Sequence, residues 1–361
     1  MLPRICALFL SLFSVMIVAE ALEPVPSPLL VSAADTRYRY EGRVDLTDPV
    51  LPLLIWSGTR VAIDFSGDYL ALNFGAVTGQ CVFDVTVDGH TEIADLRAGP
   101  FARAVWPQPL TKGRHRLELF KRSEASKGHA VFEGIVLDGL AQVWAPPAPA
   151  YKAKFEFFGD SITAGACNED GDKDQWDDFR THNHALSYAY LTSQALGADH
   201  RAVAVSGMGI RIGYVDVLAG QVWDKLYPRA DSPRADLTAW QPDVAFVNFG
   251  ENDDSFTIKD HLPFPPDWVS GYVALVRNIR AAYPHAQIVL LRGGMTGGAK
   301  SERLRTAWEA AVRELETGDA HIAHFVFTHY SKLHPRVSDD RIMADELTAW
   351  LKQQTFMTKF L

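Results

Sequence analysis

The chain has 361 residues, of which 47% are hydrophobic and 22% are charged, a composition typical of a globular protein with a large apolar core. Its formal net charge of −9 argues against nucleic acid as a partner, because binding to a polyanion favours a basic surface. The length favours two domains. We expect a monomer.

The N-terminal residues predict a secretory signal. Arg4 precedes an apolar run that continues to Val18, and the sequence AEA at 19–21 places small residues before a cleavage point. The run is short for a membrane span, and no later segment resembles one. We therefore expect residues 1–21 to be removed. The mature chain is then secreted, extracellular or periplasmic, with no membrane anchor.

Cysteine is scarce after that cleavage. Only Cys81 and Cys167 remain, and they fall in different predicted domains. A single bridge is conceivable in an oxidising compartment. The separation along the chain favours two unpaired thiols, in a protein stabilised by its core.

Residues 37–145 carry a β pattern. Apolar and polar residues alternate in 59–76 and in 81–96, and turn sequences interrupt both runs at 66–68 and 88–89. Several short strands at this spacing, without helical periodicity, predict an all-β jelly-roll sandwich. The proline-rich stretch 146–153 then predicts a stiff linker and a domain boundary.

Residues 154–361 alternate between strand-like and helix-like runs. The strand-like runs are 154–158, 201–205, 243–249, 286–292 and 321–327, and the helical runs are 184–198, 267–284, 301–318 and 339–354. This rhythm predicts an α/β domain: a three-layer, flavodoxin-like parallel sheet with helices on both faces. Reactive groups in such sheets gather beyond the carboxyl ends of the strands.

The first strand is followed by the sequence GDSITAG at 159–165. Ser161 falls where the chain leaves the sheet and begins a helical turn, so backbone N–H groups there can hold a developing negative charge. The alternative is a helix cap without chemistry. The stretch is not the Gly-x-Ser-x-Gly elbow, because Asp160 and Ile162 flank the serine and Thr163 follows where the elbow has its second glycine.

The next two strands also end in polar or glycine-rich loops. Gly207, in SGMGI, can present a backbone N–H to a ligand, although a flexible turn explains the glycines equally well. Asn252, in FGENDDS, supplies an amide donor suited to an oxyanion. We interpret Asp253 and Asp254 as loop-structuring or solvated groups.

The fifth strand is followed by a loop that contains His334, the natural candidate for a general base. His329 lies five residues earlier and is its main competitor.

In their order and placement, Ser161, Gly207, Asn252 and His334 resemble the motif residues of the GDSL/SGNH hydrolase superfamily over residues 154–356. The preceding β domain makes the chain resemble carbohydrate esterase family two more narrowly. The resemblance implies an SGNH fold and a carboxylic ester hydrolase of the EC 3.1.1 class. It further implies a secreted or cell-surface enzyme that deacetylates plant polysaccharides such as xylan and mannan, without cofactor or metal.

Carried over residue by residue, the resemblance makes Ser161 the nucleophile and His334 the base. The backbone N–H groups of Ser161 and Gly207 and the amide of Asn252 then form the oxyanion hole.

One departure from the superfamily pattern concerns the third member of a triad. The aspartate usually found three residues before the histidine is Ser331 here, and the alternative position is Lys332. We therefore predict a Ser–His dyad, with the imidazole oriented by a backbone carbonyl or a neutral group. Asp339 and Asp340 are interpreted as helix caps.

The loop ACNEDGDKDQWDDFR at 166–180 is rich in acids. Its alternating aspartates resemble a calcium loop, but the glycine and the terminal glutamate are misplaced, so we interpret it as solvated. Trp176 and Phe179 are candidates for stacking on a sugar ring at the cleft rim; covering the domain junction is an equal alternative.

The leading hypothesis is a secreted carbohydrate O-acetyl esterase whose substrate is an acetylated polysaccharide or oligosaccharide. A related esterase acting on other small or lipid esters is a second hypothesis, since this type of site permits several substrates. A glycan-binding protein with a vestigial hydrolase domain is a third.

Overall fold

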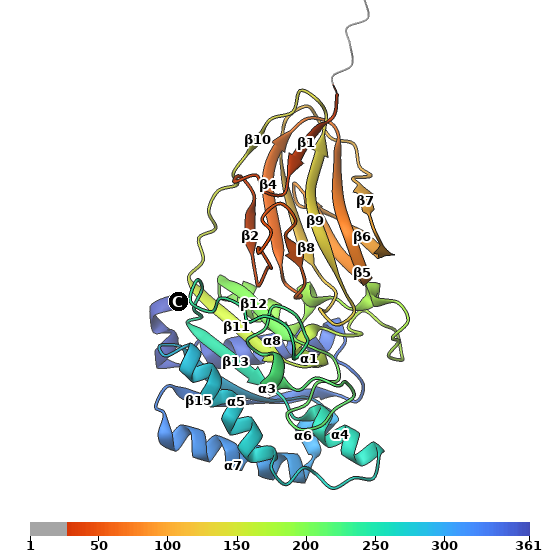
Figure 1. Cartoon of the computed structure of the whole chain (residues 1–361). Helices are drawn as coiled ribbons and strands as arrows, with labels where there is room; N and C mark the ends of the chain where they lie inside the picture. The colour runs from red at the N-terminus through yellow and green to blue at the C-terminus, as the bar shows by residue number, and fades with distance from the viewer. Residues whose placement is uncertain (1–26) are drawn as a thin grey trace, which may run out of the picture.

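The computed structural model describes residues 27–361, which form an antiparallel β domain stacked on a parallel α/β domain (Figure 1). The predicted signal sequence lies outside the described residues. No helix in the described part of the chain has both the length and the hydropathy to cross a bilayer.

The N-terminal domain is all-β, as predicted. Its strands are β1 (Leu29–Ser32), β2 (Arg39–Glu41), β3 (Leu53–Leu54), β4 (Arg60–Ser66), β5 (Leu70–Val87), β6 (His90–Gly99), β7 (Ala102–Val105), β8 (Arg114–Lys121), β9 (Gly128–Leu137) and β10 (Val143–Trp144). All pairings are antiparallel. The long strand β5 pairs with β9 and β7 along its first part and with β8 and β6 along its second, so it links both halves of the sheet.

The core of this domain follows the alternation seen in the sequence. Val61, Ile63 and Phe65 of β4 are buried together with Leu72 and Phe74 of β5. Because side chains alternate across a strand, these positions share the inner face.

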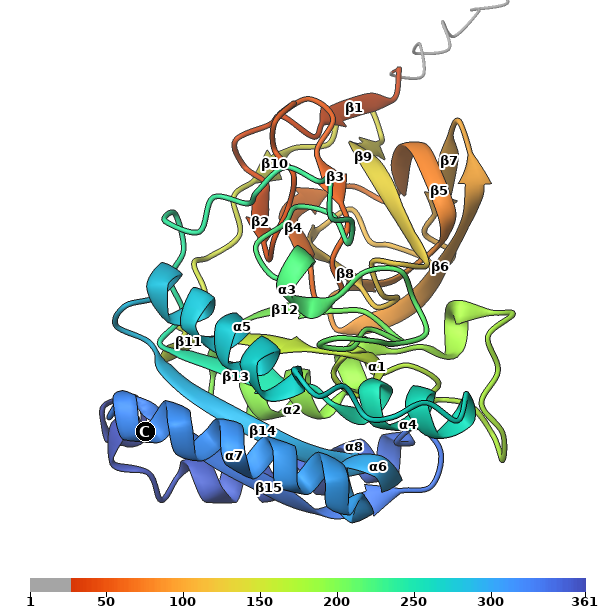
Figure 2. The same ribbon diagram turned by 60° about the horizontal axis from the view of Figure 1, so that its bottom comes forward.

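The C-terminal domain is a three-layer α/β fold, which confirms the predicted fold class (Figure 2). Its strands are β11 (Ala153–Gly159), β12 (Ala198–Ala204), β13 (Val244–Asn248), β14 (Gln287–Met295) and β15 (Ile322–Ser331). Its helices are α1 (Ser161–Ala164), α2 (Tyr188–Ala195), α3 (Ala219–Val222), α4 (Glu251–Lys259), α5 (Trp268–Ala282), α6 (Thr296–Lys300), α7 (Glu302–Gly318) and α8 (Val337–Leu351), with 3₁₀ turns η1 (Phe179–Thr181), η2 (His184–Leu186) and η3 (Thr355–Phe360).

All strands of this sheet are parallel, in the order β12-β11-β13-β14-β15. Helices α5 and α7 pack on one face, whereas α2 and α8 pack on the other. The strand order reverses at β11, so the loops after β11 and β13 open at the crevice where doubly wound folds bind ligands.

Two elements differ from the sequence expectation. The stretch after β13, expected as a loop, begins helix α4 directly at Glu251. Acidic residues in its first turn are favourable at the positive end of a helix dipole. Strand β15 continues to Ser331, because its pairing with β14 resumes at Tyr330 after a register shift near Arg292.

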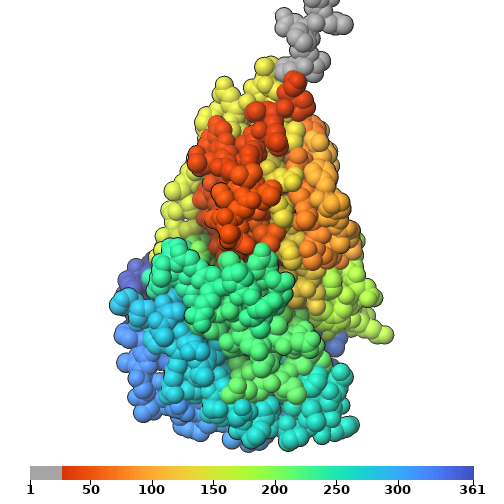
Figure 3. Space-filling view, in the orientation of Figure 1, coloured from red at the N-terminus to blue at the C-terminus, as the bar shows by residue number. Residues whose placement is uncertain are grey.

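The two domains share a buried junction. In the space-filling view, the segment between β12 and β13 (green) lies against the N-terminal domain (red) (Figure 3). Arg43 donates to the carbonyl oxygens of Trp223 and Lys225 and pairs with buried Glu156 at 2.9 Å. Because a buried charge is tolerated only when paired, this contact fixes the domains against each other.

Candidate active site

Ser161 is the first residue of helix α1, directly after the turn that ends β11. Asp160 caps this helix by accepting a hydrogen bond from the N–H of Ile162. Gly159 is required for space: a Cβ there would lie 2.1 Å from Oγ1 of Thr163. The turn therefore places the serine at the carboxyl edge of the sheet.

His334 contacts this serine across 173 positions of the sequence: its Nε2 lies 2.9 Å from Oγ of Ser161. The competitor His329 instead pairs with Asp339, 2.7 Å from Nε2 to Oδ1. The structure thus brings Ser161 together with His334 and leaves His329 elsewhere.

A carboxylate orients His334, so the expectation of a neutral or backbone partner is wrong. Nδ1 of His334 lies 2.6 Å from Oδ2 of Asp174. The acid comes from the loop before η1 rather than from Ser331 or Lys332. A carboxylate can only accept here, so Nδ1 carries the hydrogen and Nε2 is free to accept from the serine hydroxyl.

Asp174 is ionised in this arrangement. Burial alone would raise its pKa, but hydrogen bonds from His334 and Arg336 outweigh that effect and lower the pKa to about 2. Nη1 of Arg336 lies 2.8 Å from Oδ1 of Asp174, and Arg336 also donates to the carbonyl oxygens of Gly171 and Cys167.

These contacts correct the interpretation of the loop as solvated. Asp170 accepts hydrogen bonds from the backbone and side chain of Gln175, whereas Asp172 is exposed. Asp170 and Asp174 are thus directed at protein donors and are not arranged as the ligands of a calcium loop.

Asp339 and Asp340 do not contact His334. Asp339 caps α8 by accepting from the N–H of Arg336, and Asp340 accepts from the N–H of Tyr188.

Two overlapping side-chain groups, Cys167–Asp170–His182 and Cys167–Asp174–His334, are compact enough to surround a metal ion. Burial raises the pKa of the Cys167 thiol, as do Asp174 and Asp170. The protonated thiol is a poor metal ligand. Cys81 and Cys167 are both buried and unbridged, which confirms the predicted free thiols.

Gly207 follows β12 with φ of +83°, a backbone conformation that favours glycine. A Cβ there would lie 3.0 Å from Cβ of Tyr214. Its N–H donates to no other residue within 27–361, and the residue lines the same cleft as Ser161. This N–H is available to a ligand.

Asn252 lies in the first turn of α4 and is 94% buried, with 6% of its surface exposed. Its Nδ2 donates to Oδ2 of Asp160 at 3.0 Å and to the carbonyl oxygen of Met208 at 3.1 Å. Burial raises the pKa of Asp160 to about 8. Both amide hydrogens therefore have protein acceptors, and an anion in the cleft would have to share one of them.

The cleft at these residues has a volume of about 430 Å³. Trp176 is 40% exposed at its rim, with its ring centroid 5.3 Å from that of His334. Phe179 does not line the cleft; its N–H donates to Gln80 of the N-terminal domain. Nζ of Lys127 lies 5.3 Å from the Trp176 centroid and 5.4 Å from that of Phe179.

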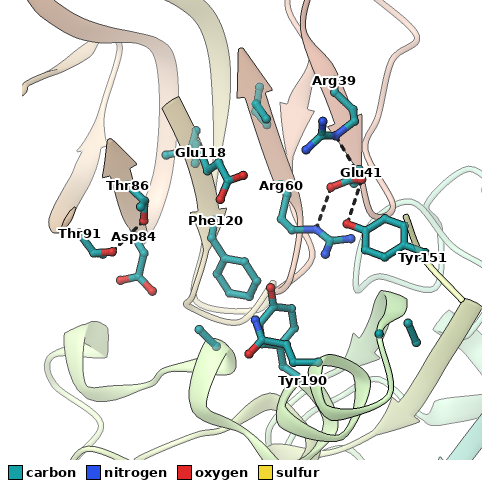
Figure 4. A pocket seen from close by; sticks show the side chains of 17 residues that line it. Arg39, Glu41, Arg60, Asp84, Thr86, Thr91, Glu118, Phe120, Tyr151 and Tyr190 are labelled. Carbon is teal, nitrogen blue, oxygen red and sulfur yellow. Dashed lines mark hydrogen bonds and ion pairs between the residues drawn. The ribbon is translucent and has the colours of Figure 1, made fainter. Parts of the chain in front are cut away.

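A second hollow, of about 610 Å³, lies at the domain junction (Figure 4). In it Glu41 contacts Arg39, Arg60 and Tyr151. None of the predicted strand-end residues lines it. Ser161, Gly207, Asn252 and His334 instead line the smaller cleft.

Comparison with known proteins places both domains in described families. Residues 40–147 match the carbohydrate esterase 2 N-terminal family, and residues 157–350 match the GDSL-like lipase/acylhydrolase family.

Two curated relatives cover nearly all of this chain. Cellulase/esterase CelE of Acetivibrio thermocellus is 30% identical over 326 residues, which are 87% of this chain and 39% of that protein. An acetylxylan esterase/glucomannan deacetylase of Cellvibrio japonicus is 28% identical over 322 residues, 85% of this chain and 87% of the relative. The chain thus spans well under half of CelE and most of the second relative.

Solved structures show the same two-domain plan. A family two carbohydrate esterase from Clostridium thermocellum, solved with cellohexaose, is similar with a TM-score of 0.78 and 29% identity over 87% of this chain and 98% of that one. A family two carbohydrate esterase from Cellvibrio japonicus shares the fold with a TM-score of 0.78 at 22% identity, over 93% of this chain and 99% of the other. The chain therefore belongs to the GDSL-like lipase/acylhydrolase family, within the family two carbohydrate esterases.

Proposed function

We propose that this protein is a secreted, monomeric esterase that removes O-acetyl groups from a polysaccharide or oligosaccharide, with Ser161 as nucleophile. The observation that supports it most directly is the 2.9 Å contact between Oγ of Ser161 and Nε2 of His334 at an open cleft. The names of the relatives favour xylan and glucomannan as substrates.

The reaction begins when His334 accepts the hydroxyl proton and Ser161 attacks the acetyl carbonyl carbon. The resulting tetrahedral intermediate collapses as the C–O bond to the sugar breaks, and the imidazolium returns the proton to the departing sugar oxygen. Water, deprotonated by His334, then attacks the acetyl-serine. Acetate leaves and the serine recovers its proton.

Asp174 acts through His334 rather than on the substrate. Its hydrogen bond to Nδ1 holds the tautomer in which Nε2 can accept from Ser161. Because its pKa is low, it also remains negative while the imidazolium forms, which stabilises the developing positive charge. We therefore replace the predicted dyad with a Ser161–His334–Asp174 triad.

The oxyanion of the intermediate is assigned to the N–H groups of Ser161 and Gly207 and to the amide of Asn252. Support comes from the N–H of Gly207, which has no acceptor among residues 27–361, and from the shared lining of the cleft. Donors aimed at developing charge before the reaction begins are most effective, because no reorganisation accompanies the chemical step.

Trp176 is assigned as a sugar platform, since its exposed ring borders the catalytic histidine. Phe179 is assigned a supporting role, because it lies beside the same Lys127 but outside the cleft lining. No cofactor or metal enters this proposal.

The experiment is a timed acetate assay on acetylated xylan, acetylated glucomannan and a long-chain fatty acyl ester, with wild type and Ser161→Ala. We expect acetate from at least one glycan, lost in Ser161→Ala, and poor turnover of the long chain. Preferential hydrolysis of the long chain would establish a lipid esterase instead. Glycan binding without acetate release, unchanged in Ser161→Ala, would establish a binding protein.

A further inference from the structure

We propose that Glu124, a residue of the N-terminal domain, positions the oxyanion-hole peptide of Gly207, so that the β domain is part of the catalytic apparatus. This inference depends on the proposed esterase chemistry, and it concerns a residue that the reaction scheme above does not use.

Glu124 lies in the turn between β8 and β9, and only 1% of its surface is exposed. One oxygen, Oε2, accepts from both the N–H and the hydroxyl of Ser206, at 2.9 and 2.6 Å. Ser206 immediately precedes Gly207. The carboxylate therefore holds the peptide that leads into the proposed oxyanion donor.

The Gly207 peptide is held from its other side as well. The carbonyl oxygen of Gly207 accepts from the N–H of Tyr214 at 2.8 Å, and the N–H of Met208 donates to Val205 at 3.2 Å. Because both flanks are held, the Gly207 N–H, which has no acceptor in the described part of the chain, points in a fixed direction. Removing Glu124 would release one flank only.

The charge of Glu124 is retained despite burial. Burial raises its pKa, but Lys127 and the hydrogen bonds from Ser206 and Ser126 outweigh this effect and lower it. Oε1 accepts from Oγ of Ser126 at 2.8 Å and lies 3.4 Å from Nζ of Lys127. Hydrogen bonds to an ionised acceptor are stronger than neutral ones, which suits a residue that must hold a loop rigidly.

The turn that carries Glu124 is itself anchored in both domains. Nζ of buried Lys121 donates to the carbonyl oxygen of Ser123 at 2.7 Å, and Oγ of Ser123 accepts from the N–H of Val82 at 3.0 Å. Ala125 packs in the core of the α/β domain. These contacts fix the turn relative to the β sheet, and Glu124 in turn fixes Ser206.

The same turn also reaches the loop that supplies Asp174. Buried Arg122 pairs with Asp84 at 2.8 Å, pairs with Glu169, and donates to the carbonyl oxygen of Arg180 at 2.8 Å. Gln80 of β5 donates to Asp178 at 2.7 Å. The N-terminal domain therefore contacts both the loop that supplies Asp174 and the residue before Gly207.

The test compares Glu124→Ala and Glu124→Gln with wild type on an acetylated glycan and on 4-nitrophenyl acetate. We expect Glu124→Ala to lower kcat by about 10- to 100-fold with little change in KM, since small displacements of a catalytic group are costly. Glu124→Gln should recover most of this loss. Both Ser206 bonds go to a single oxygen, which the amide preserves.

The matched control is Asp64→Asn, which alters a buried carboxylate of the same domain that pairs with Arg114 and Arg116 away from the cleft. We expect it to lower the thermal midpoint but not kcat. A second readout is affinity for a boronic acid, which forms a tetrahedral adduct on the serine. It should weaken in Glu124→Ala in proportion to kcat/KM.

Should Glu124→Ala fail to fold, Ser206→Ala removes one of the two bonds and is expected to lower kcat severalfold. The inference is wrong if folded Glu124→Ala, or Ser206→Ala in its place, keeps the wild-type kcat and boronate affinity. It is equally wrong if Glu124→Gln loses as much activity as Glu124→Ala. If wild type cleaves 4-nitrophenyl acetate but no acetylated glycan, the substrate proposal fails. The role of Glu124 is then tested by kcat for the synthetic ester alone.

Discussion

Two regions build the candidate site in different ways. The ends of the parallel strands provide Ser161, Gly207, Asn252 and His334, whereas segments outside the sheet provide Asp174 and Glu124. The strand-end groups face the substrate cleft. Asp174 and Glu124 lie behind the strand-end groups. In the proposal, Asp174 orients His334 and stabilises its charge, and Glu124 positions the Gly207 peptide. In the proposed mechanism, the sheet supplies the reacting groups, and the surrounding loops and the β domain hold these groups in position.

The largest expected effects come from the strand-end pair. Ser161→Ala and His334→Ala should each lower kcat for acetate release by about 10⁴- to 10⁶-fold, because nucleophile and base act as a unit. The matched control is His329→Ala, which removes the other aspartate-paired histidine near the end of β15. Comparable losses of kcat in His329→Ala and His334→Ala would contradict the assignment of His334, rather than His329, as the general base.

The next effect tests the outer group that contacts His334. Asp174→Asn should lower kcat by about 10²- to 10⁴-fold, since the imidazole loses its tautomer control and its counter-charge. Asp339→Asn, in the neighbouring His–Asp pair, should leave kcat unchanged. Wild-type turnover in a folded Asp174→Asn protein would show that Asp174 is not needed and would favour a Ser161–His334 dyad.

A smaller loss is expected at the oxyanion hole. Asn252→Ala should lower kcat by about 10²- to 10³-fold, the usual cost of one donor, with little change in KM. Because Asn252 also bonds to Asp160 and Met208, thermal melts of the variant must accompany the kinetics. An unchanged kcat would mean that the amide serves only those internal contacts.

The smallest effect concerns stability against pH. The pKa of Asp174 is about 2 in the folded protein and 3.8 ordinarily, so its ion pairing adds stability above about pH 4 that is lost as the pH falls towards 2. The difference in unfolding free energy between wild type and Asp174→Asn, from urea titrations, should shrink over that window. If the difference in unfolding free energy did not depend on pH, the ion pairing of Asp174 would not contribute to stability.

The fold and the strand-end residues could be predicted from sequence because both are local. Alternating strands and helices indicate a parallel sheet, and each of the four motif residues lies two to four residues beyond the end of a strand. The orienting acid could not be predicted the same way. It lies 160 residues from His334, and its position depends on Arg336. The one available signal was an acid-rich loop beside Trp176.

Glu124 shows the same limit. In the sequence it belongs to a β domain, and its proximity to the site is visible only in the structure, where Ala125 packs in the opposite core and Glu124 bonds to Ser206. The helix after β13 differs from the expectation for another reason: its residues 252–255, an asparagine, two aspartates and a serine, have weak helical propensity, and the packing of α4 against α6 and α7 supports the helix.

The two buried thiols have a practical consequence for production. Cys81 and Cys167 lie in different domains and neither is bridged. Assembly of the described fold therefore involves no oxidation step and no disulfide isomerase. The chain should refold from urea with equal yield in the presence or absence of a reductant, and a reducing host cytosol should suffice for its expression.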